Sequence, residues 1–173
     1  MLNLKGEKIY LRALEPEDLQ FLYELENDSS IWEISGTTTP YSKHVLQLYL
    51  DNAHRDIYDV NPLRLCICDL EDNRIGLIDL FDYEPNNNRA GLGIVIKNLN
   101  NRNQGTGSES IKVLLDYAFS NLNLHQVFAN VAEDNTMSRH LFEKMGFEKI
   151  GVKKDWILVN GSYKNEILYQ KIK

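Results

Sequence analysis

The sequence contains few of the residues that cross-link small secreted proteins or bind metals. Its 173 residues include only two cysteines, Cys66 and Cys68, which lie two residues apart in an apolar run. Two ligands are too few for a structural zinc site, and the four histidines show no ligand spacing. We therefore expect no metal site. We interpret the cysteines as buried core thiols, with a metal or redox pair as the alternative.

Long apolar runs and a basic surplus are also missing. No run approaches the roughly 18 apolar residues that a membrane-spanning helix needs. The first five residues contain no apolar signal segment, so we expect a cytoplasmic protein with no membrane partner. The net charge of −6 and the pI of about 5.2 disfavour a nucleic-acid partner, which would require a basic face.

Charge is unevenly divided along the chain. Residues 1–84 contain 17 acidic and 7 basic residues, whereas residues 85–173 contain 8 acidic and 12 basic residues. One interpretation is a solvated acidic helix face. The other is an acidic field that attracts a cationic acceptor, with the basic half holding an anionic cofactor.

The order of apolar patterns predicts one domain over residues 1–173, because no repeat or linker interrupts it. The predicted fold class is α/β (α+β), with a mixed, mostly antiparallel sheet of about seven strands flanked by about four helices. The turn Asn160-Gly161 indicates a hairpin between the last two strands. We expect strands near 8–13, 63–69, 74–81, 89–96, 126–132, 148–156 and 163–171, and helices after 15, 42, 107 and 135.

A glycine-containing loop follows one predicted strand and precedes a helix. It reads Arg102-Asn103-Gln104-Gly105-Thr106-Gly107-Ser108. Glycines let backbone N–H groups approach an anion, and the helix N-terminus adds positive potential. The loop is neither a Walker loop nor a Rossmann fingerprint. By itself it indicates either a phosphate site or a flexible turn.

A second motif runs from Asn135 to Phe147, Asn-Thr-Met-Ser-Arg-His-Leu-Phe-Glu-Lys-Met-Gly-Phe. Asn135 is suited to cap a helix and Gly146 to end it, a purely structural interpretation. That interpretation does not explain Ser138, one turn into the helix.

Together the two motifs resemble those of the GNAT superfamily of N-acetyltransferases. The first matches at Arg102, Gly105 and Gly107. The second matches at Asn135, Ser138, Phe142, Lys144, Gly146 and Phe147. The opening Tyr10–Asp18 is similar to the branch that holds spermidine N-acetyltransferases and ribosomal-protein N-terminal acetyltransferases.

The resemblance implies the cofactor acetyl-CoA and a site for it. The strand backbone at Ile94, Val95 and Ile96 would bind the pantetheine arm. Asn135, Ser138 and Lys144 would line that arm. The pyrophosphate would meet the loop, whose implied contact residues are Arg102, Asn103, Gln104, Gly105, Thr106, Gly107 and Ser108.

The implied reaction needs a base, because only a neutral amine attacks a thioester. An alkyl ammonium has a pKa near 10, so deprotonation at pH 7 costs roughly 4 kcal/mol. The candidate bases are Asp79, Asp82, Glu84 and Glu33. Alternation along a strand would put Asp79 and Asp82 on opposite faces unless a bulge intervenes.

Three departures from the family pattern bear on the acceptor and on the acid step. Phe142 replaces a tyrosine that in many relatives protonates the leaving thiolate. The stretch 37–41 and Gly91 replace acids of the polyamine enzymes. We expect the acceptor to be a primary amine of a polyamine such as spermidine. The N-terminus of a (ribosomal) protein or another small amine is the alternative. A catalytically degenerate CoA-binding protein is the alternative from another class. A homodimer or higher homo-oligomer is also expected.

Overall fold

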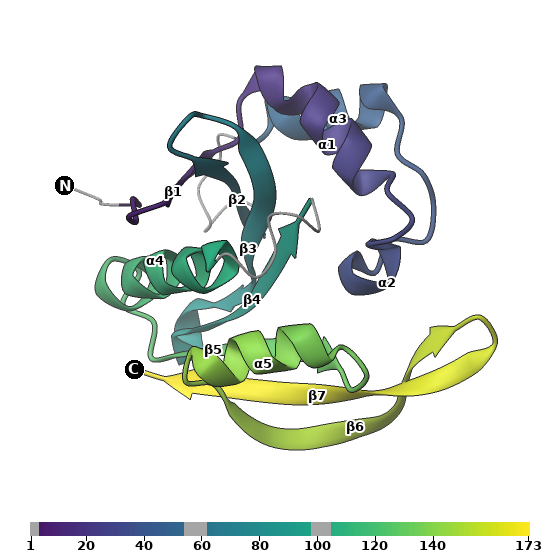
Figure 1. Cartoon of the computed structure of the whole chain (residues 1–173). Helices are drawn as coiled ribbons and strands as arrows, with labels where there is room; N and C mark the ends of the chain where they lie inside the picture. The colour runs from purple at the N-terminus through teal and green to yellow at the C-terminus, as the bar shows by residue number, and fades with distance from the viewer. Residues whose placement is uncertain (1–3, 54–61, 98–104) are drawn as a thin grey trace.

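The computed structural model describes residues 4–53, 62–97 and 105–173. Seven strands form one sheet in the order β1-β2-β3-β4-β5-β7-β6 (Figure 1). The strands are β1 (Ile9–Ala13), β2 (Leu63–Asp69), β3 (Arg74–Glu84), β4 (Arg89–Ile96), β5 (Gln126–Ala132), β6 (Glu148–Val159) and β7 (Ser162–Ile172). The α-helices are α1 (Leu19–Glu26), α2 (Trp32–Ser35), α3 (Lys43–Asp51), α4 (Thr106–Ser120) and α5 (Thr136–Lys144).

The predicted mixed sheet of seven strands is confirmed. The described residues hold five α-helices, one more than the approximate count from the sequence. The additional helix, α2, is only four residues long and has no fully buried residue, so it carries no apolar stripe that a periodicity could reveal. Among these helices none is long and apolar enough to cross a bilayer.

Strand pairing is antiparallel everywhere except between β4 and β5. β1 to β4 form a meander, and β5, β7 and β6 form a second antiparallel group. The parallel β4–β5 ladder joins the two groups through three residue pairs, from Arg89↔Gln126 to Gly91↔Phe128. The sheet is therefore held together at its centre by its shortest ladder.

Helices cover both faces of the meander. α4 packs on the face that presents Leu65 and Ile67 of β2, whereas α1 and α3 pack on the opposite face with Cys66 and Cys68. The cysteine side chains are fully buried with their sulfurs 3.7 Å apart, so the predicted core thiols are confirmed. The described part of the chain contains no cluster of metal-ligating side chains.

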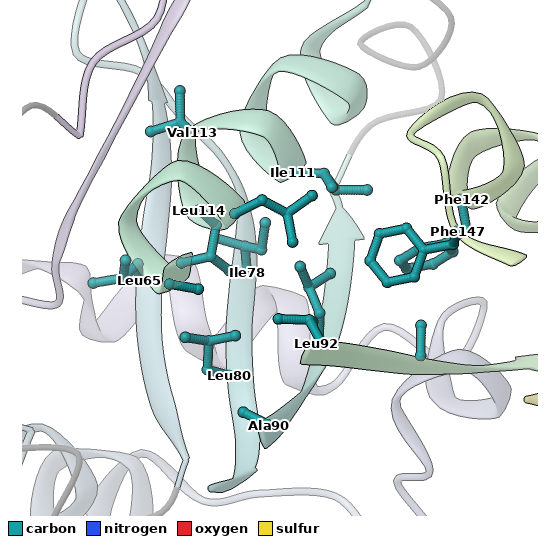
Figure 2. Packing of buried hydrophobic residues seen from close by; sticks show 14 of the residues in the cluster. Leu65, Ile78, Leu80, Ala90, Leu92, Ile111, Val113, Leu114, Phe142 and Phe147 are labelled. Carbon is teal, nitrogen blue, oxygen red and sulfur yellow. The ribbon is translucent and has the colours of Figure 1, made fainter. Parts of the chain in front are cut away.

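The larger core lies between α4, α5 and the sheet. Figure 2 shows Ile111 and Leu114 of α4 directed at Ile78 of β3 and Leu92 of β4. Beyond them the rings of Phe142 and Phe147 meet edge to face, with centroids 5.1 Å apart. This packing fixes α4 and α5 over the central strands.

A buried carboxylate ties the start of α1 to the sheet. Asp18 accepts hydrogen bonds from Arg12 at 2.8 and 3.0 Å, from Arg74, and from the Glu15 backbone at 2.8 Å. Burial raises the pKa of Asp18, but the two guanidinium groups outweigh burial and lower that pKa to about 2.

The predicted ends of α5 and the last hairpin are also observed. The Asn135 side chain accepts a hydrogen bond from the Ser138 N–H at 3.1 Å and so caps α5. Gly146 follows the helix in the left-handed region, with φ of 81°. Asn160 and Gly161 turn β6 into β7 with φ of 49° and 79°, as a type I′ hairpin requires.

Candidate functional site

A divergence of two parallel strands creates the site. β4 and β5 pair only as far as Gly91 and Phe128, although β4 continues to Ile96. The backbone of Leu92 to Val95 therefore lies along an edge that β5 no longer covers. Such an edge can accept an extended ligand as an added strand.

The first cavity, of about 410 Å³, opens beside this edge. It lies between β4, the beginning of α4 and one side of α5. Its lining comprises Ile34, Ile94, Val95, Ile96, Gly105, Thr106, Gly107, Ser108, Asn135, Met137, Ser138, His140, Leu141 and Lys144. All of the predicted cofactor residues within the described ranges thus come together in one cavity.

The N-terminus of α4 forms one wall of the first cavity. Gly105 adopts φ of 82°, which favours glycine, and starts the helix. The first helical hydrogen bond runs from Glu109 N–H to the Gly105 carbonyl at 3.0 Å, so the amides of Gly107 and Ser108 precede the helical ladder. Gly107 also lies close to α5, because a Cβ there would sit 3.3 Å from Leu141. The wall is suited to an anion such as a phosphate.

The prediction that Arg102, Asn103 and Gln104 bind the cofactor concerns residues outside the described ranges. It therefore stays a prediction from the sequence. Lys144 and His140 line the described part of the cavity, and His140 was not among the sequence candidates.

The second cavity, of about 530 Å³, adjoins the first along β4 and extends to residues of α1, α2, β3 and β7. Carboxylates from four different elements line it: Glu26 of α1, Glu33 of α2, Asp79 of β3 and Glu166 of β7. Arg64 of β2 lines it as well. Residues far apart in sequence thus give this cavity its acidic character.

Arg64 holds two of these carboxylates. Its guanidinium donates two hydrogen bonds to Asp79, at 2.9 and 3.0 Å, and one to Glu26 at 2.7 Å. Burial lowers the pKa of Arg64, but the two carboxylates outweigh burial and raise it above its ordinary value. Both oxygens of Asp79 therefore already accept from Arg64 before any acceptor enters.

Lysines pair with the other two carboxylates of the second cavity. Lys164 of β7 contacts Glu33 at 2.6 Å and Asp134 at 2.7 Å, and so links α2 to the hairpin and to the start of α5. Lys153 of β6 contacts Glu166 at 2.5 Å. Together with Asp134, these ion pairs comprise five carboxylates and three cations. The net charge of this group around the second cavity is therefore negative.

Asp82 lies elsewhere. The β3–β4 register shifts between Phe81 and Glu84, and Asp82 adopts φ of 47° within this bulge. This is the bulge that was named as the exception to strict alternation of Asp79 and Asp82 between the two faces of the strand. Asp82 is exposed and lines neither cavity, and Glu84 instead accepts from the Asn86 N–H at 3.2 Å. The geometry supports Asp79 and Glu33, rather than Asp82, as groups that can reach an acceptor.

Five residues line both cavities and mark their junction. They are Ile34, Ile94, Val95, Asn135 and Ser138. Phe142 lines only the second cavity. A ligand in the first cavity and another in the second would meet beside these residues.

Sequence reasoning missed Glu26, Arg64 and Glu166. Glu26 ends an amphipathic helix and Glu166 lies within a strand, so neither stands in a motif. For Arg64 the sequence did contain one signal. The short turn after Asp69 predicts a hairpin, and that hairpin places Arg64 opposite Asp79.

An open sheet edge with a helix N-terminus suited to an anion and an adjoining acidic cavity can hold an anionic and a cationic substrate next to each other. A sequence profile described as an acetyltransferase (GNAT) domain matches residues 8–148. The chain therefore belongs to the GNAT acetyltransferase family and is an N-acetyltransferase.

Similar proteins support this assignment over more than nine-tenths of the chain. Spermidine N(1)-acetyltransferase of Vibrio cholerae is 32% identical over 160 residues, covering 92% of this chain and 90% of that protein. The Escherichia coli K12 protein of the same name is 30% identical over 163 residues, covering 94% and 84%. A crystal structure of the Vibrio cholerae enzyme in complex with CoA and spermine superposes with a TM-score of 0.87 at 28% identity, covering 96% of each chain.

Proposed function

We propose that this protein transfers the acetyl group of acetyl-CoA to a primary amine of a polyamine such as spermidine. The observation that supports the proposal is that a cavity walled by the N-terminus of α4 meets an acidic cavity along β4. The first cavity suits a long cofactor with a pyrophosphate, and the second suits a cationic acceptor.

The cofactor fits the first cavity by its chemistry. The amides of Gly107 and Ser108 at the start of α4 would meet the pyrophosphate, with Lys144 nearby. The β4 backbone at Ile94 and Val95 would bond the amides of the pantetheine arm. When bound, acetyl-CoA supplies the activated acetyl group, and the residues of this chain hold it against the junction of the cavities.

The acceptor reaches that junction from the second cavity. Its ammonium groups would be attracted by the five carboxylates that share three cations. One ammonium must then lose a proton, to Asp79 or Glu33 directly or through water, before its nitrogen attacks the carbonyl carbon. A β4 backbone N–H could stabilise the oxyanion that forms.

Release of free CoA from acetyl-CoA tests this function. We expect turnover with spermidine or spermine to exceed that with a simple monoamine or with a peptide bearing a free N-terminus. Preference for the peptide would identify an N-terminal acetyltransferase instead. Tight CoA binding with no CoA release for any amine would identify a degenerate, non-catalytic member.

We further propose that the chain forms a homo-oligomer. A spermidine N-acetyltransferase of Vibrio cholerae with 31% identity and a TM-score of 0.80 is described as dodecameric. In this chain β6 is an edge strand of twelve residues, and its apolar side chains Ile150, Trp156 and Leu158 are more than half exposed. A long exposed apolar edge favours pairing with another chain.

A further inference from the structure

Lys164 is a single cation between two carboxylates. Its ammonium group lies 2.6 Å from Glu33 of α2 and 2.7 Å from Asp134, which precedes α5. Figure 1 shows α2 facing the β6–β7 hairpin that carries Lys164. Asp134 and Glu33 raise the pKa of Lys164, so the lysine stays charged at neutral pH. The three side chains together carry a net charge of −1, and one further cation would balance them.

The three side chains differ in their access to the second cavity. Glu33 lines that cavity, whereas Lys164 and Asp134 line neither cavity. Lys164 contacts the Oε1 atom of Glu33, and a carboxylate offers several acceptor positions on its two oxygens. An ammonium group in the cavity can therefore reach Glu33 and compete with Lys164 for it.

The second carboxylate makes this exchange easy. When Lys164 leaves Glu33 it keeps its contact with Asp134, so an incoming ammonium creates two ion pairs and leaves no charge unpaired. Glu33 is 39% exposed, and an ion pair at such a site stabilises a protein only weakly. The lysine thus loses little when another cation takes its place.

The other two cations of the second cavity are bound more firmly. Arg64 holds its two carboxylates by three hydrogen bonds, and those carboxylates are only 13% and 20% exposed. Lys153 contacts one carboxylate, Glu166, within the described residues, so it would lose its only counter-ion there. Among the three cations, Lys164 is therefore the one that an acceptor can displace.

We propose that Lys164 occupies Glu33 as a stand-in for an ammonium group of the acceptor and is displaced when a polyamine binds. This inference rests on the proposed function. A polyamine whose reacting nitrogen has lost its proton still carries another ammonium, which takes Glu33 while Lys164 stays on Asp134. A monoamine in the same state has no ammonium left for Glu33. Lys164 thus determines how much a second amino group adds to affinity, because that group must compete with the lysine.

The variant Lys164→Met removes the competitor and keeps the length of the side chain. We expect the dissociation constant of spermidine, measured by calorimetry with the protein saturated with CoA, to fall by about threefold to fivefold, the effect of one exposed ion pair. The dissociation constant of CoA should change by less than about twofold, which also shows that the variant is folded. The control is Lys154→Met, at an exposed lysine of the same hairpin that lines neither cavity. It should leave spermidine binding unchanged.

The direction of the change separates competition from a structural role. If Lys164 only fastened α2 to the hairpin, its loss would loosen α2 and weaken spermidine binding. Competition predicts tighter binding instead.

A charge-neutral double variant separates competition from a general effect of net charge. Lys164→Met combined with Asp134→Asn removes one positive and one negative charge, so the net charge equals that of the wild type. A general charge effect would leave the affinity for spermidine at its wild-type value. Loss of the competitor should still make binding at least about twofold tighter, because Glu33 is then free for the acceptor.

The choice of amine provides a further control. In Lys164→Met, kcat/KM for spermidine and 1,4-diaminobutane should rise by about threefold to fivefold. For butylamine it should stay unchanged, because the single nitrogen of butylamine must be uncharged to react and cannot pair with Glu33.

Four results would each overturn the role of Lys164. They are unchanged or weaker spermidine binding in Lys164→Met, wild-type affinity in the double variant, an equal gain in Lys154→Met, and an equal gain for butylamine. A wild-type protein that releases no CoA with any amine overturns the proposed function instead. Calorimetry needs no turnover, so it then decides the role of Lys164 separately, and absence of spermidine binding in wild type and variant alike overturns both.

Discussion

Arg64 and Asp79 lie directly opposite each other in the β2–β3 register and are joined by two hydrogen bonds of 2.9 and 3.0 Å. The third donor of Arg64 reaches Glu26 at the end of α1. One side chain thus links a helix to two strands and fixes two carboxylates of the second cavity. Its partial burial makes the link sensitive to loss of either charge.

Replacement of Arg64 by methionine should destabilise the protein. The change leaves Glu26 and Asp79, only 13% and 20% exposed, without their cation. We expect a loss of about 2 kcal/mol in the free energy of unfolding, below the value for fully buried pairs because solvent screens this one. Urea denaturation measures it. Lys112→Met, which breaks an exposed pair with Asp116, is the control and should change stability by less than about 0.5 kcal/mol. Equal effects would contradict a structural role for Arg64.

Introduction of aspartate at Gly107 should weaken CoA binding. The new carboxylate would stand in the first turn of α4, where it repels the pyrophosphate, and its Cβ would press on Leu141. We expect about a 30-fold loss of affinity, equivalent to roughly 2 kcal/mol, measured by calorimetry. Gly151→Asp on β6, where an added Cβ meets nothing within 4 Å, is the matched control. Unchanged affinity in the Gly107 variant would place the pyrophosphate elsewhere.

The candidate bases can be separated by amide substitutions. Asp79 and Glu33 line the second cavity, whereas Asp82 is exposed and lines neither cavity. We expect one of the two substitutions, Asp79→Asn or Glu33→Gln, to lower kcat by about 10²- to 10⁴-fold. The same substitution should remove the rising limb of the pH profile of kcat, as loss of a general base does. Asp82→Asn should change kcat by less than twofold, since asparagine tolerates the positive φ there. A large loss of kcat in Asp82→Asn alone would instead identify Asp82, in the bulge of β3, as the general base.

Acid should remove the stabilisation that Asp18 provides. Its folded-state pKa of about 2 lies below its ordinary value of 3.8, so the contribution is complete above about pH 5 and is lost as pH falls toward 2. The shift corresponds to about 2 kcal/mol. Asp18→Asn should therefore be less stable than wild type at pH 7, and the difference should shrink between pH 4 and pH 2. A difference that is independent of pH would show that packing, not charge, explains the loss. Asp116→Asn, at an exposed site, is the control.

A charge on the edge strand should reduce self-association. Leu158 on β6 is 60% exposed, so lysine can replace it without opening the core. We expect Leu158→Lys to shift the molecular mass in light scattering toward the monomer, because a charged edge resists pairing. Leu70→Lys, at an exposed leucine in the β2–β3 turn, is the matched control and should keep the wild-type mass. A monomeric wild type would contradict the proposed oligomer outright.

The sequence by itself determined the strands, the main helices and most of the residues that line the first cavity. These features depend on local chemistry: alternation in β1, the Asn135 cap, the positive φ of Gly146 and the turn at Asn160-Gly161. The predicted cofactor residues lie in two continuous segments and the strand before them, so a motif could contain them. Helix α2 is too short for its sequence to show the hydrophobic periodicity of a helix.

Only the tertiary structure decided the second cavity. Its charged groups come from four separate elements, and their pairing depends on how the sheet and helices pack: Glu26 from α1, Arg64 from β2, Asp79 from β3, and Lys164 and Glu166 from β7. The bulge that exposes Asp82 depends on the β3–β4 register, and the junction of the two cavities depends on where β4 leaves β5. Sequence spacing records which neighbours a residue has along the chain, whereas charge pairing and cavity shape depend on distances between elements far apart in it.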